Sequence, residues 1–456
     1  MYAKRICVLS REAPGLIIAA PASGSGKTVV TLGILRALRR RDLRVNPAKL
    51  GPDYIDPAFH TIAAGCSSVN IDLWAMRSVR FTQEVRALSA TSDIVLCEGV
   101  MGLFDGIGSR GLGSTADISA LTGWPIIFII DAAKQGTSLV ALLSGFRSHR
   151  ADIDIAGVIL NKVGGSSHAT LLRDAIAQHY PDFPVLGTIP RNPDLHLPSR
   201  HLGLIQATET QNLESFLEKA ADQIDTALDI DQLLSLARPS HLPEVAAPEP
   251  PLPPLGQRIA VAMDAAFAFT YPQILAGWRK SGAEILPFSP LAGESVPTNV
   301  DAVFLPGGYP ELHAPALTAS SFLPSLRTAA ARQAVIYGEC GGYMILGRGI
   351  VDTKGHRHAM AGLLPLETSF AEQKRHLGYR QLSLTTSCIL GSRGATFRGH
   401  EFHYTTILRE SGANSLFTVT DGLENVLGPT GLIQGRIAGS FIHLIDHCEM
   451  PLGKDA

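Results

Sequence analysis

The sequence contains few cysteines and no closely spaced pair of them. No Cys-x-x-Cys motif occurs anywhere in the chain. This scatter argues against a cysteine-built metal site and against a disulfide framework, and it favours a reducing compartment such as the cytoplasm. The six positions are Cys7, Cys66, Cys97, Cys340, Cys388 and Cys448.

Long apolar runs and blocks of one charge are also absent. The most apolar run, residues 125–130, has the length of a strand and is far too short to span a membrane, and the apolar part of residues 1–10 is too short for a secretory signal. The 39 basic and 41 acidic side chains nearly cancel. This balance argues against a generic nucleic-acid surface. We therefore expect a cytoplasmic protein that binds neither a membrane nor nucleic acid.

What the chain does contain is the composition of a multidomain α/β protein. Its 456 residues, of which 45% are hydrophobic and 44 are glycine, predict two or three domains. In the first half, short apolar runs without strict alternation are separated by helical patterns, which is typical of a doubly wound, mostly parallel sheet. The expected strands lie at 15–19, 44–50, 93–97, 126–130, 155–160 and 185–189.

A proline-rich segment separates the two halves. Residues 243–254 (PEVAAPEPPLPP) cannot build a helix or a central strand, so we predict domains at 1–237 and 257–456 with a linker at 238–256. The second half restarts the alternation of strands and helices at residue 258. From about Leu382 onward the spacing shortens and β-prone residues accumulate, which predicts antiparallel strands that complete its sheet.

Residues 20–28 (APASGSGKT) form the most specific local pattern of the first half. They lie between the apolar run 15–19 and the helical pattern 29–40. In a phosphate-binding loop, glycines let backbone amides converge on an anion, a lysine reaches the outer phosphates and a hydroxyl ligates magnesium. The alternative is a turn of small residues with an incidental lysine, but the flanking strand and helix favour the phosphate loop. The predicted nucleotide-binding residues are Ser23, Gly24, Ser25, Gly26, Lys27 and Thr28.

Acidic residues follow the next two expected strands. Asp53 lies in the segment after the second strand, and Glu98 follows the third. Because ligands of a doubly wound sheet bind at the carboxyl ends of its strands, we expect Thr28, Asp53 and Glu98 to hold Mg²⁺ beside the phosphates. Asp56 and Asp105 are candidates of the same kind, but an aspartate before proline or glycine is equally often a turn former.

Asn161 ends the expected strand at 155–160. At that edge of the sheet its amide is placed to read a nucleotide base. An asparagine that caps the end of a strand would give the same pattern, so both interpretations stay open.

A second site is indicated in the second half. Residues 338–342 (GECGG) have the spacing of a sharp strand-to-helix elbow, which predicts that Cys340 is an exposed nucleophile with a pKa lowered by the helix N-terminus. Glycines that follow an expected strand, among them Gly308, together with Gly341, are candidates for an oxyanion hole. His443 is the preferred base and His403 its main competitor. An isolated cysteine is more often a buried small side chain, but the elbow spacing favours the catalytic role.

These segments resemble one known family throughout the chain, the cobyrinic acid a,c-diamide synthases, also called hydrogenobyrinic acid a,c-diamide synthases. Pro21, in place of the usual first glycine of the loop motif, fits the synthetase branch of phosphate-loop proteins. The resemblance implies an N-terminal domain similar to dethiobiotin synthetase and a C-terminal class I glutamine amidotransferase domain. The matching stretches are 22–28, 49–57 (KLGPDYIDP), 98–106 (EGVMGLFDG), 200–204, 306–311, 338–342 and 399–404 (GHEFHY).

The resemblance also implies the reaction. ATP and Mg²⁺ would activate the a and c acetate carboxylates of a corrinoid as acyl phosphates, and glutamine would supply the nitrogen in cobalamin biosynthesis; a homodimer is compatible with it. Ile445 stands where the family usually has a histidine, and the third member of the Cys340–His443 site is not assigned. The alternatives are diamidation of another tetrapyrrole such as nickel-sirohydrochlorin and, less favoured, a cobyric acid synthase. An alternative of a different class is a partitioning-type phosphate-loop ATPase.

Overall fold

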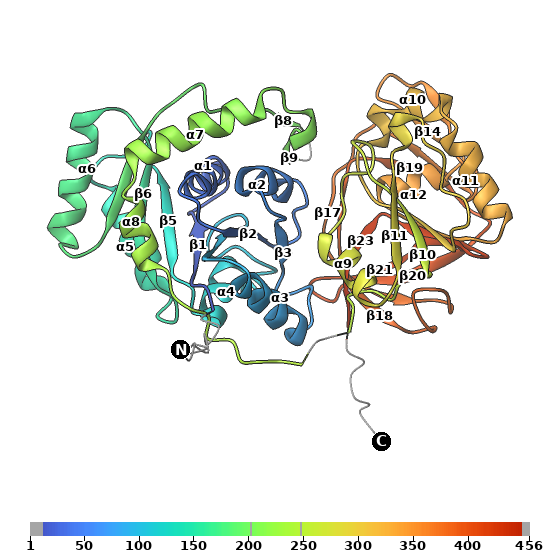
Figure 1. Cartoon of the computed structure of the whole chain (residues 1–456), viewed down its shortest axis with the longest axis horizontal. Helices are drawn as coiled ribbons and strands as arrows, with labels where there is room; N and C mark the ends of the chain where they lie inside the picture. The colour runs from blue at the N-terminus through green and yellow to red at the C-terminus, as the bar shows by residue number, and fades with distance from the viewer. Residues whose placement is uncertain (1–11, 201–202, 247–248, 449–456) are drawn as a thin grey trace, which may run out of the picture. The chain divides into compact units, whose positions relative to one another are not determined.

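The computed structural model describes residues 12–200, 203–246 and 249–448 (Figure 1). These residues form two compact units. The first comprises the described residues up to 246 apart from 75–77, and the second comprises 75–77 and the described residues from 249 onward. The change of unit falls inside the predicted linker 238–256. Residues 1–10, with Cys7, and residues 201–202 of the stretch 200–204 lie outside the described residues.

The first unit is built on a seven-stranded sheet whose pairings are all parallel, as the sequence predicts. The order is β3-β2-β4-β1-β5-β6-β7, so β1 is the middle strand. Its carboxyl end therefore lies at the centre of the edge formed by the carboxyl ends of all seven strands. The strands are β1 (Gly15–Ala19), β2 (Val45–Leu50), β3 (Val69–Ile71), β4 (Ile94–Glu98), β5 (Ile126–Asp131), β6 (Ile155–Val163) and β7 (Val185–Pro190); a short hairpin of β8 (Ser199–Arg200) and β9 (Gly203–Leu204) follows.

Helices cover this sheet on both faces, which gives the doubly wound arrangement. α7 runs across α1 (Figure 1), and Gly33 of α1 allows the close approach, since a Cβ there would meet the Ala220 carbonyl oxygen at 2.9 Å. The helices are α1 (Lys27–Arg40), α2 (Asp56–Ala64), α3 (Ser78–Ala90), α4 (Thr115–Thr122), α5 (Leu139–His149), α6 (Ser166–His179), the 3₁₀ turn η1 (Ala207–Glu209), α7 (Leu213–Ala227) and α8 (Ile230–Leu236).

The second unit contains a ten-stranded mixed sheet. β11-β10-β12-β13-β22 pair in parallel, and the strands from β22 through β21-β20-β17-β18 to β23 pair antiparallel, which confirms the predicted change of spacing. Its strands are β10 (Arg258–Ala262), β11 (Glu284–Phe288), β12 (Ala302–Leu305), β13 (Val335–Glu339), β17 (His376–Leu384), β18 (Thr396–His403), β20 (Asn414–Asp421), β21 (Val426–Gln434), β22 (Ile437–Ser440) and β23 (Ile442–His447).

A second, four-stranded sheet and short helices complete this unit. The small sheet has the order β15-β14-β16-β19 and consists of β14 (Gly349–Val351), β15 (Arg357–Ala359), β16 (Leu366–Ser369) and β19 (Thr406–Glu410). The helical segments are α9 (Pro272–Lys280), η2 (Pro290–Ala292), η3 (Pro310–Leu312), α10 (Ala314–Ala319), α11 (Phe322–Ala331) and α12 (Gly341–Leu346). Among the described residues, no helix combines the length and apolar character needed to cross a bilayer.

Candidate active sites

The predicted phosphate loop lies between β1 and α1. Gly24 and Gly26 have φ angles of 81° and 91°, a region that L side chains rarely adopt. Gly26 is the N-cap residue of α1, and no acidic side chain occupies the first turn of that helix. Ser25 steadies the turn by donating from Oγ to the Ala22 carbonyl oxygen at 2.9 Å. The backbone amides and the positive end of a 14-residue helix therefore meet at one anion-binding point.

Lys27 is held at the mouth of this loop. Its Nζ donates to the carbonyl oxygens of Met101 at 2.6 Å and Ala22 at 3.3 Å. Burial lowers the pKa of Lys27, while the nearby Glu98 carboxylate opposes that shift. The ammonium group is thus placed over the loop by backbone oxygens, which a phosphate oxygen can replace as the partner.

The carboxylate of Glu98 organises the carboxyl ends of β4, β1 and β2. Its Oε1 accepts from Thr28 Oγ1 at 2.7 Å and from Lys49 Nζ at 3.0 Å, and its Oε2 lies 2.7 Å from His60 Nε2. Lys49 also contacts Asp56 Oδ2 at 2.6 Å. Although burial opposes ionisation, Lys49, His60 and Thr28 outweigh it and hold the pKa of Glu98 below its usual range. The structure therefore brings Thr28 and Glu98 together, as the sequence predicts.

The other acidic candidates are arranged differently. Asp53 Oδ1 accepts from the Ile55 amide at 2.8 Å in the turn before α2, and burial together with the neighbouring Asp56 raises the pKa of Asp53 to about 7. Asp105 Oδ2 accepts from the Gly102 amide at 2.8 Å, which is the turn-forming role. Asp56, by contrast, forms an ion pair with Lys49. Asp105 is therefore a turn former, whereas Asp56 belongs to the network of side chains around Glu98.

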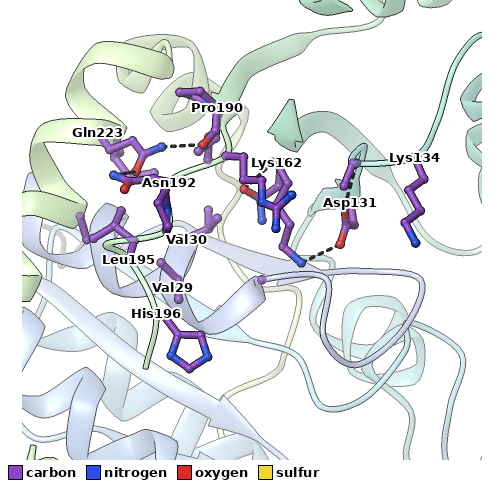
Figure 2. Close-up of a pocket in the computed structure, with 18 residues that line it drawn as sticks. Val29, Val30, Asp131, Lys134, Lys162, Pro190, Asn192, Leu195, His196 and Gln223 are labelled. Atoms are coloured by element: carbon purple, nitrogen blue, oxygen red, sulfur yellow. Dashed lines mark hydrogen bonds and ion pairs between the residues drawn. The ribbon is translucent and has the colours of Figure 1, made fainter. Parts of the chain in front are cut away.

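Asn161 packs against the phosphate loop. Its Nδ2 donates to the Ser25 carbonyl oxygen at 2.9 Å, and its Oδ1 accepts from the Lys162 amide at 2.9 Å. Lys162 Nζ in turn donates to the Gly24 carbonyl oxygen at 3.0 Å and to Asp131 Oδ2 at 2.7 Å, the ion pair drawn in Figure 2. In this structure the Asn161 side chain therefore supports the loop through Nδ2, while its Oδ1 contacts the next residue of its own segment.

Asn161 lines a cavity of about 530 Å³. Figure 2 shows this cavity in close-up. It extends from the phosphate loop between α1, the residues after β7 and α7. Its wall combines apolar side chains with polar and charged ones, a make-up that can hold a small molecule. Residues of the wall that Figure 2 labels include Val29, Val30, Asp131, Lys134, Lys162, Asn192, Leu195, His196 and Gln223.

The second site is an elbow between β13 and α12. Cys340 joins them with φ 49° and ψ −108°, a conformation that is rare for a residue with a side chain. Its amide donates to the Ser440 carbonyl oxygen at 2.8 Å, which anchors the elbow to the neighbouring strand β22. Gly338 permits the tight turn, since a Cβ there would meet the Gly342 backbone at 2.8 Å. The predicted strand-to-helix elbow at Cys340 is therefore present.

Cys340 and His443 face each other across Gly307. A Cβ built on Gly307 would lie 2.8 Å from His443 Nε2 and 3.0 Å from Cys340 Cβ. A Cβ built on Gly341 would lie 3.1 Å from the Gly308 amide nitrogen, so the two amides predicted to form an oxyanion hole are close to one another. The competing base His403 instead lies 3.0 Å from Glu401 Oε1, and its ring stacks on Phe441.

The thiol of Cys340 is not the exposed, acidified group expected from the sequence. Cys340 is 2% exposed, and burial raises its pKa to about 12, with the Gly341 amide as the main opposing interaction. The expectation was wrong because α12 has only six residues and the desolvation of the thiolate outweighs its N-terminal dipole. Burial and the nearby His400 and His403 also lower the pKa of His443 to about 3. Both groups are therefore neutral at pH 7.

We expect Gly307→Ala to abolish use of glutamine and to spare use of free ammonia. The added methyl would lie 2.4 Å from His443 Cε1, so the imidazole must move away from Cys340. A displacement near 1 Å costs about 100-fold in rate. Glutaminase turnover, measured as glutamate release, checks this result. Gly145→Ala is the matched control, because its Cβ would meet nothing within 4 Å; equal activity of the two variants would contradict the placement of His443.

Four ionisable residues of these sites were not given a role by the sequence. Lys49, His60 and Lys162 belong to the phosphate-loop side, and Glu339 lies beside His443. The available signal was an ionisable side chain inside a run that otherwise reads as a buried strand, as Lys49 is in β2 and Glu339 is in β13. Pairing of these residues could not be read from sequence, because their partners come from other strands.

Family comparisons cover both units. Residues 16–205 match the CobQ/CobB/MinD/ParA nucleotide binding domain, and residues 258–449 match the CobB/CobQ-like glutamine amidotransferase domain. The chain is thus a glutamine-dependent ligase with a nucleotide-binding unit. The amidotransferase match argues against a partitioning ATPase, which needs no such domain.

Curated relatives extend over nearly the whole chain. The hydrogenobyrinate a,c-diamide synthases of Rhizobium meliloti (strain 1021) and Brucella anthropi are each 49% identical over 95% of this chain, and cover 100% and 99% of their own lengths. The enzyme of the same name from Brucella abortus biovar 1 is 50% identical over 95% of this chain and 98% of its own length. With such identity across both domains, the chain belongs to the hydrogenobyrinate a,c-diamide synthase family.

Proposed function

We propose that this chain uses ATP and glutamine to amidate the a and c acetate carboxylates of hydrogenobyrinic or cobyrinic acid. The observation that carries the proposal is the presence, in one chain, of a phosphate loop with Lys27 and an elbow with Cys340 facing His443. The first suits activation of a carboxylate by a nucleotide, and the second suits release of ammonia from an amide. The names of the relatives supply the tetrapyrrole substrate.

The carboxylate must be activated because its oxygen is a poor leaving group. In the proposed reaction, a carboxylate oxygen attacks the γ-phosphorus of ATP, ADP leaves, and an acyl phosphate forms. Ammonia then attacks the acyl carbon and inorganic phosphate leaves, which gives the amide. Since carboxylate and triphosphate repel, positive charge from Lys27 and the amides around Gly24 and Gly26 is needed where they meet.

The cavity beside the loop is the proposed place for the nucleoside. It adjoins Gly26 and Asn161, so a nucleotide whose phosphates occupy the loop would direct its sugar and base into it. Its wall offers Lys162, Asn192 and Gln223 as hydrogen-bonding groups. The base-reading role proposed for Asn161 would require its amide to exchange a contact with the loop for a contact with the base.

The donor set at Thr28 fits a magnesium ion. The Thr28 hydroxyl and the Glu98 carboxylate already share a contact of 2.7 Å, and hard oxygen donors next to a phosphate site are what Mg²⁺ prefers. Thr28 and Glu98 would hold the ion, and Asp53, which follows β2, is the third candidate ligand. When bound, it would neutralise charge on the phosphate oxygens. Lys49 and His60 orient the Glu98 carboxylate through its two oxygens.

We expect Thr28→Val to raise the Mg²⁺ concentration for half-maximal amidation by about tenfold or more, because the variant keeps the shape of threonine and loses one oxygen ligand. Thr28→Ser is the matched control, since it keeps the hydroxyl that donates to Glu98. The measurement is a magnesium titration of ammonia-driven amidation at saturating ATP. Identical titration curves for the valine and serine variants would remove Thr28 from the metal site.

The substrate assignment is tested with purified full-length protein and a panel of tetrapyrroles. Cobyrinic acid, hydrogenobyrinic acid and nickel-sirohydrochlorin are each incubated with ATP, magnesium and glutamine labelled with ¹⁵N in its side-chain amide. We expect mass spectrometry to find two labelled amides in one of the corrinoids, with one ATP consumed for each amide. Labelling of nickel-sirohydrochlorin alone would replace the proposed substrate, and glutamine hydrolysis without labelling of any of them would overturn the proposal.

A further inference from the structure

The residue immediately before Cys340 carries a buried carboxyl group that faces the proposed base. Glu339 is the last residue of β13 and is 2% exposed. Its Oε1 accepts from the Leu444 amide at 3.1 Å, and its Oε2 lies 3.7 Å from His443 Nδ1. The Glu339 side chain therefore connects β13, which ends beside Cys340, to β23, the strand that carries His443.

The imidazole of His443 presents its two nitrogens to different partners. Its Nε2 side faces Gly307 and Cys340, since a Cβ at Gly307 would lie 2.8 Å from Nε2 and 3.0 Å from Cys340 Cβ. Its Nδ1 side faces Glu339. A histidine that takes a proton from a nucleophile through Nε2 needs its other proton on Nδ1, and an acceptor at Nδ1 fixes that tautomer.

Strand pairing holds this carboxyl group in place. Glu339 is opposite Ser440 in the parallel pair of β13 and β22, and the chain enters β23 two residues later. The Leu444 amide then anchors Oε1, which leaves Oε2 toward the ring. The two residues that follow His443 are Leu444 and Ile445, neither of which has a side-chain acceptor. The acceptor comes from the neighbouring strand instead.

We propose that Glu339 is the positioning residue of the glutaminase site: it accepts a hydrogen bond from His443 Nδ1–H once the separation of 3.7 Å closes during the reaction, and this directs Nε2 to take the Cys340 proton. This inference rests on the proposed glutaminase role of Cys340 and His443. As the thiol proton moves from Sγ to Nε2, the sulfur attacks the amide carbon of glutamine and the ring becomes an imidazolium. The Glu339 carboxylate stabilises that cation. The ring then gives the proton to the amide nitrogen, the C–N bond breaks, ammonia leaves, and water hydrolyses the resulting thioester to glutamate and the free thiol.

The electrostatic surroundings of His443 disfavour its imidazolium form. Burial, with His400 and His403, lowers the pKa of His443 to about 3, so without a nearby negative charge the imidazolium is strongly disfavoured. Burial also raises the pKa of Glu339 to about 8, against the Leu444 amide and the Tyr337 hydroxyl.

The other titratable groups facing Glu339 are Tyr337 on its own strand, the Cys340 thiol and His443. The carboxylate form of Glu339 therefore becomes populated as the pH rises through about 8.

The test compares Glu339→Gln and Glu339→Asp with Glu410→Gln in the full-length protein. Glu410 is a carboxylate of the same unit that accepts from the Tyr343 hydroxyl, and glutamine keeps an acceptor there. For Glu339→Gln we expect the kcat of glutamine hydrolysis to fall by about 100-fold or more, because the amide carries no charge to offset the imidazolium. KM for glutamine and ammonia-driven amidation stay near the wild-type values.

A pH profile separates positioning from a structural role. The wild-type kcat should rise as the pH passes through about 8, and Glu339→Gln should lack that rise. Glu339→Asp keeps a charge and should recover part of the loss. Wild-type turnover in Glu339→Gln, or equal losses in the Gln and Asp variants with the pH-dependent rise intact, would overturn the inference. If instead the wild-type protein released no glutamate at all, the proposed function itself would fail.

Discussion

We expect Cys340→Ala to lose glutamine-dependent amidation completely while amidation driven by free ammonia continues. The thiol is the group that attacks the glutamine amide in the proposed reaction, and no other described cysteine lies on an elbow facing a histidine. Loss of a covalent nucleophile costs about 10⁴-fold or more in turnover. Ammonia added directly bypasses that step, because Lys27 and the phosphate loop belong to the other unit.

The experiment measures amide formation with glutamine and then with ammonium chloride at a pH that provides free ammonia. Cys388→Ala is the matched control, since it removes a partly buried thiol from the same unit outside the elbow. Thermal unfolding checks that both variants fold. Equal loss with both nitrogen sources would contradict the assignment of Cys340 as the nucleophile.

The parts of the fold predicted from sequence are those with strong local signals. β1 is a continuous buried run, Gly26 and Lys27 mark the start of α1, and the proline-rich segment contains the change of unit. Each of these depends on residues close together in the chain, so a single sequence carries them. β3 was missed, because its three residues are too few to form a pattern.

The site residues were predicted less completely, because their chemistry depends on neighbours from distant segments. The network of Glu98 with Lys49 and His60 joins β4, β2 and α2. The pKa of Cys340 depends on burial by the surrounding core, which a helix N-terminus visible in sequence does not reveal. Glu339 is adjacent to Cys340 in sequence, but its relation to His443 follows from the strand order β13-β22 and the return through β23.

For Lys27→Met we expect the reverse of the Cys340→Ala result. This variant should stop amidation with glutamine and with ammonia alike, by about 10³-fold or more, because it removes the cation at the point where carboxylate and triphosphate meet. Methionine keeps much of the length of the side chain but cannot replace the contacts of Nζ with Met101 and Ala22. Hydrolysis of glutamine should persist, since Cys340, His443 and Glu339 all lie in the second unit.

Lys219→Met is the matched control, because Lys219 is an exposed lysine on α7 of the same unit. ADP formation, amide formation and glutamate release are measured on each variant with both nitrogen sources. Lys27→Met should lose the first two and keep the third, whereas Cys340→Ala should keep the first two with ammonia and lose the third. Unchanged turnover of Lys27→Met would remove the phosphate loop from the reaction. Together the two variants assign activation of the carboxylate and release of ammonia to separate units, each through its own named residue.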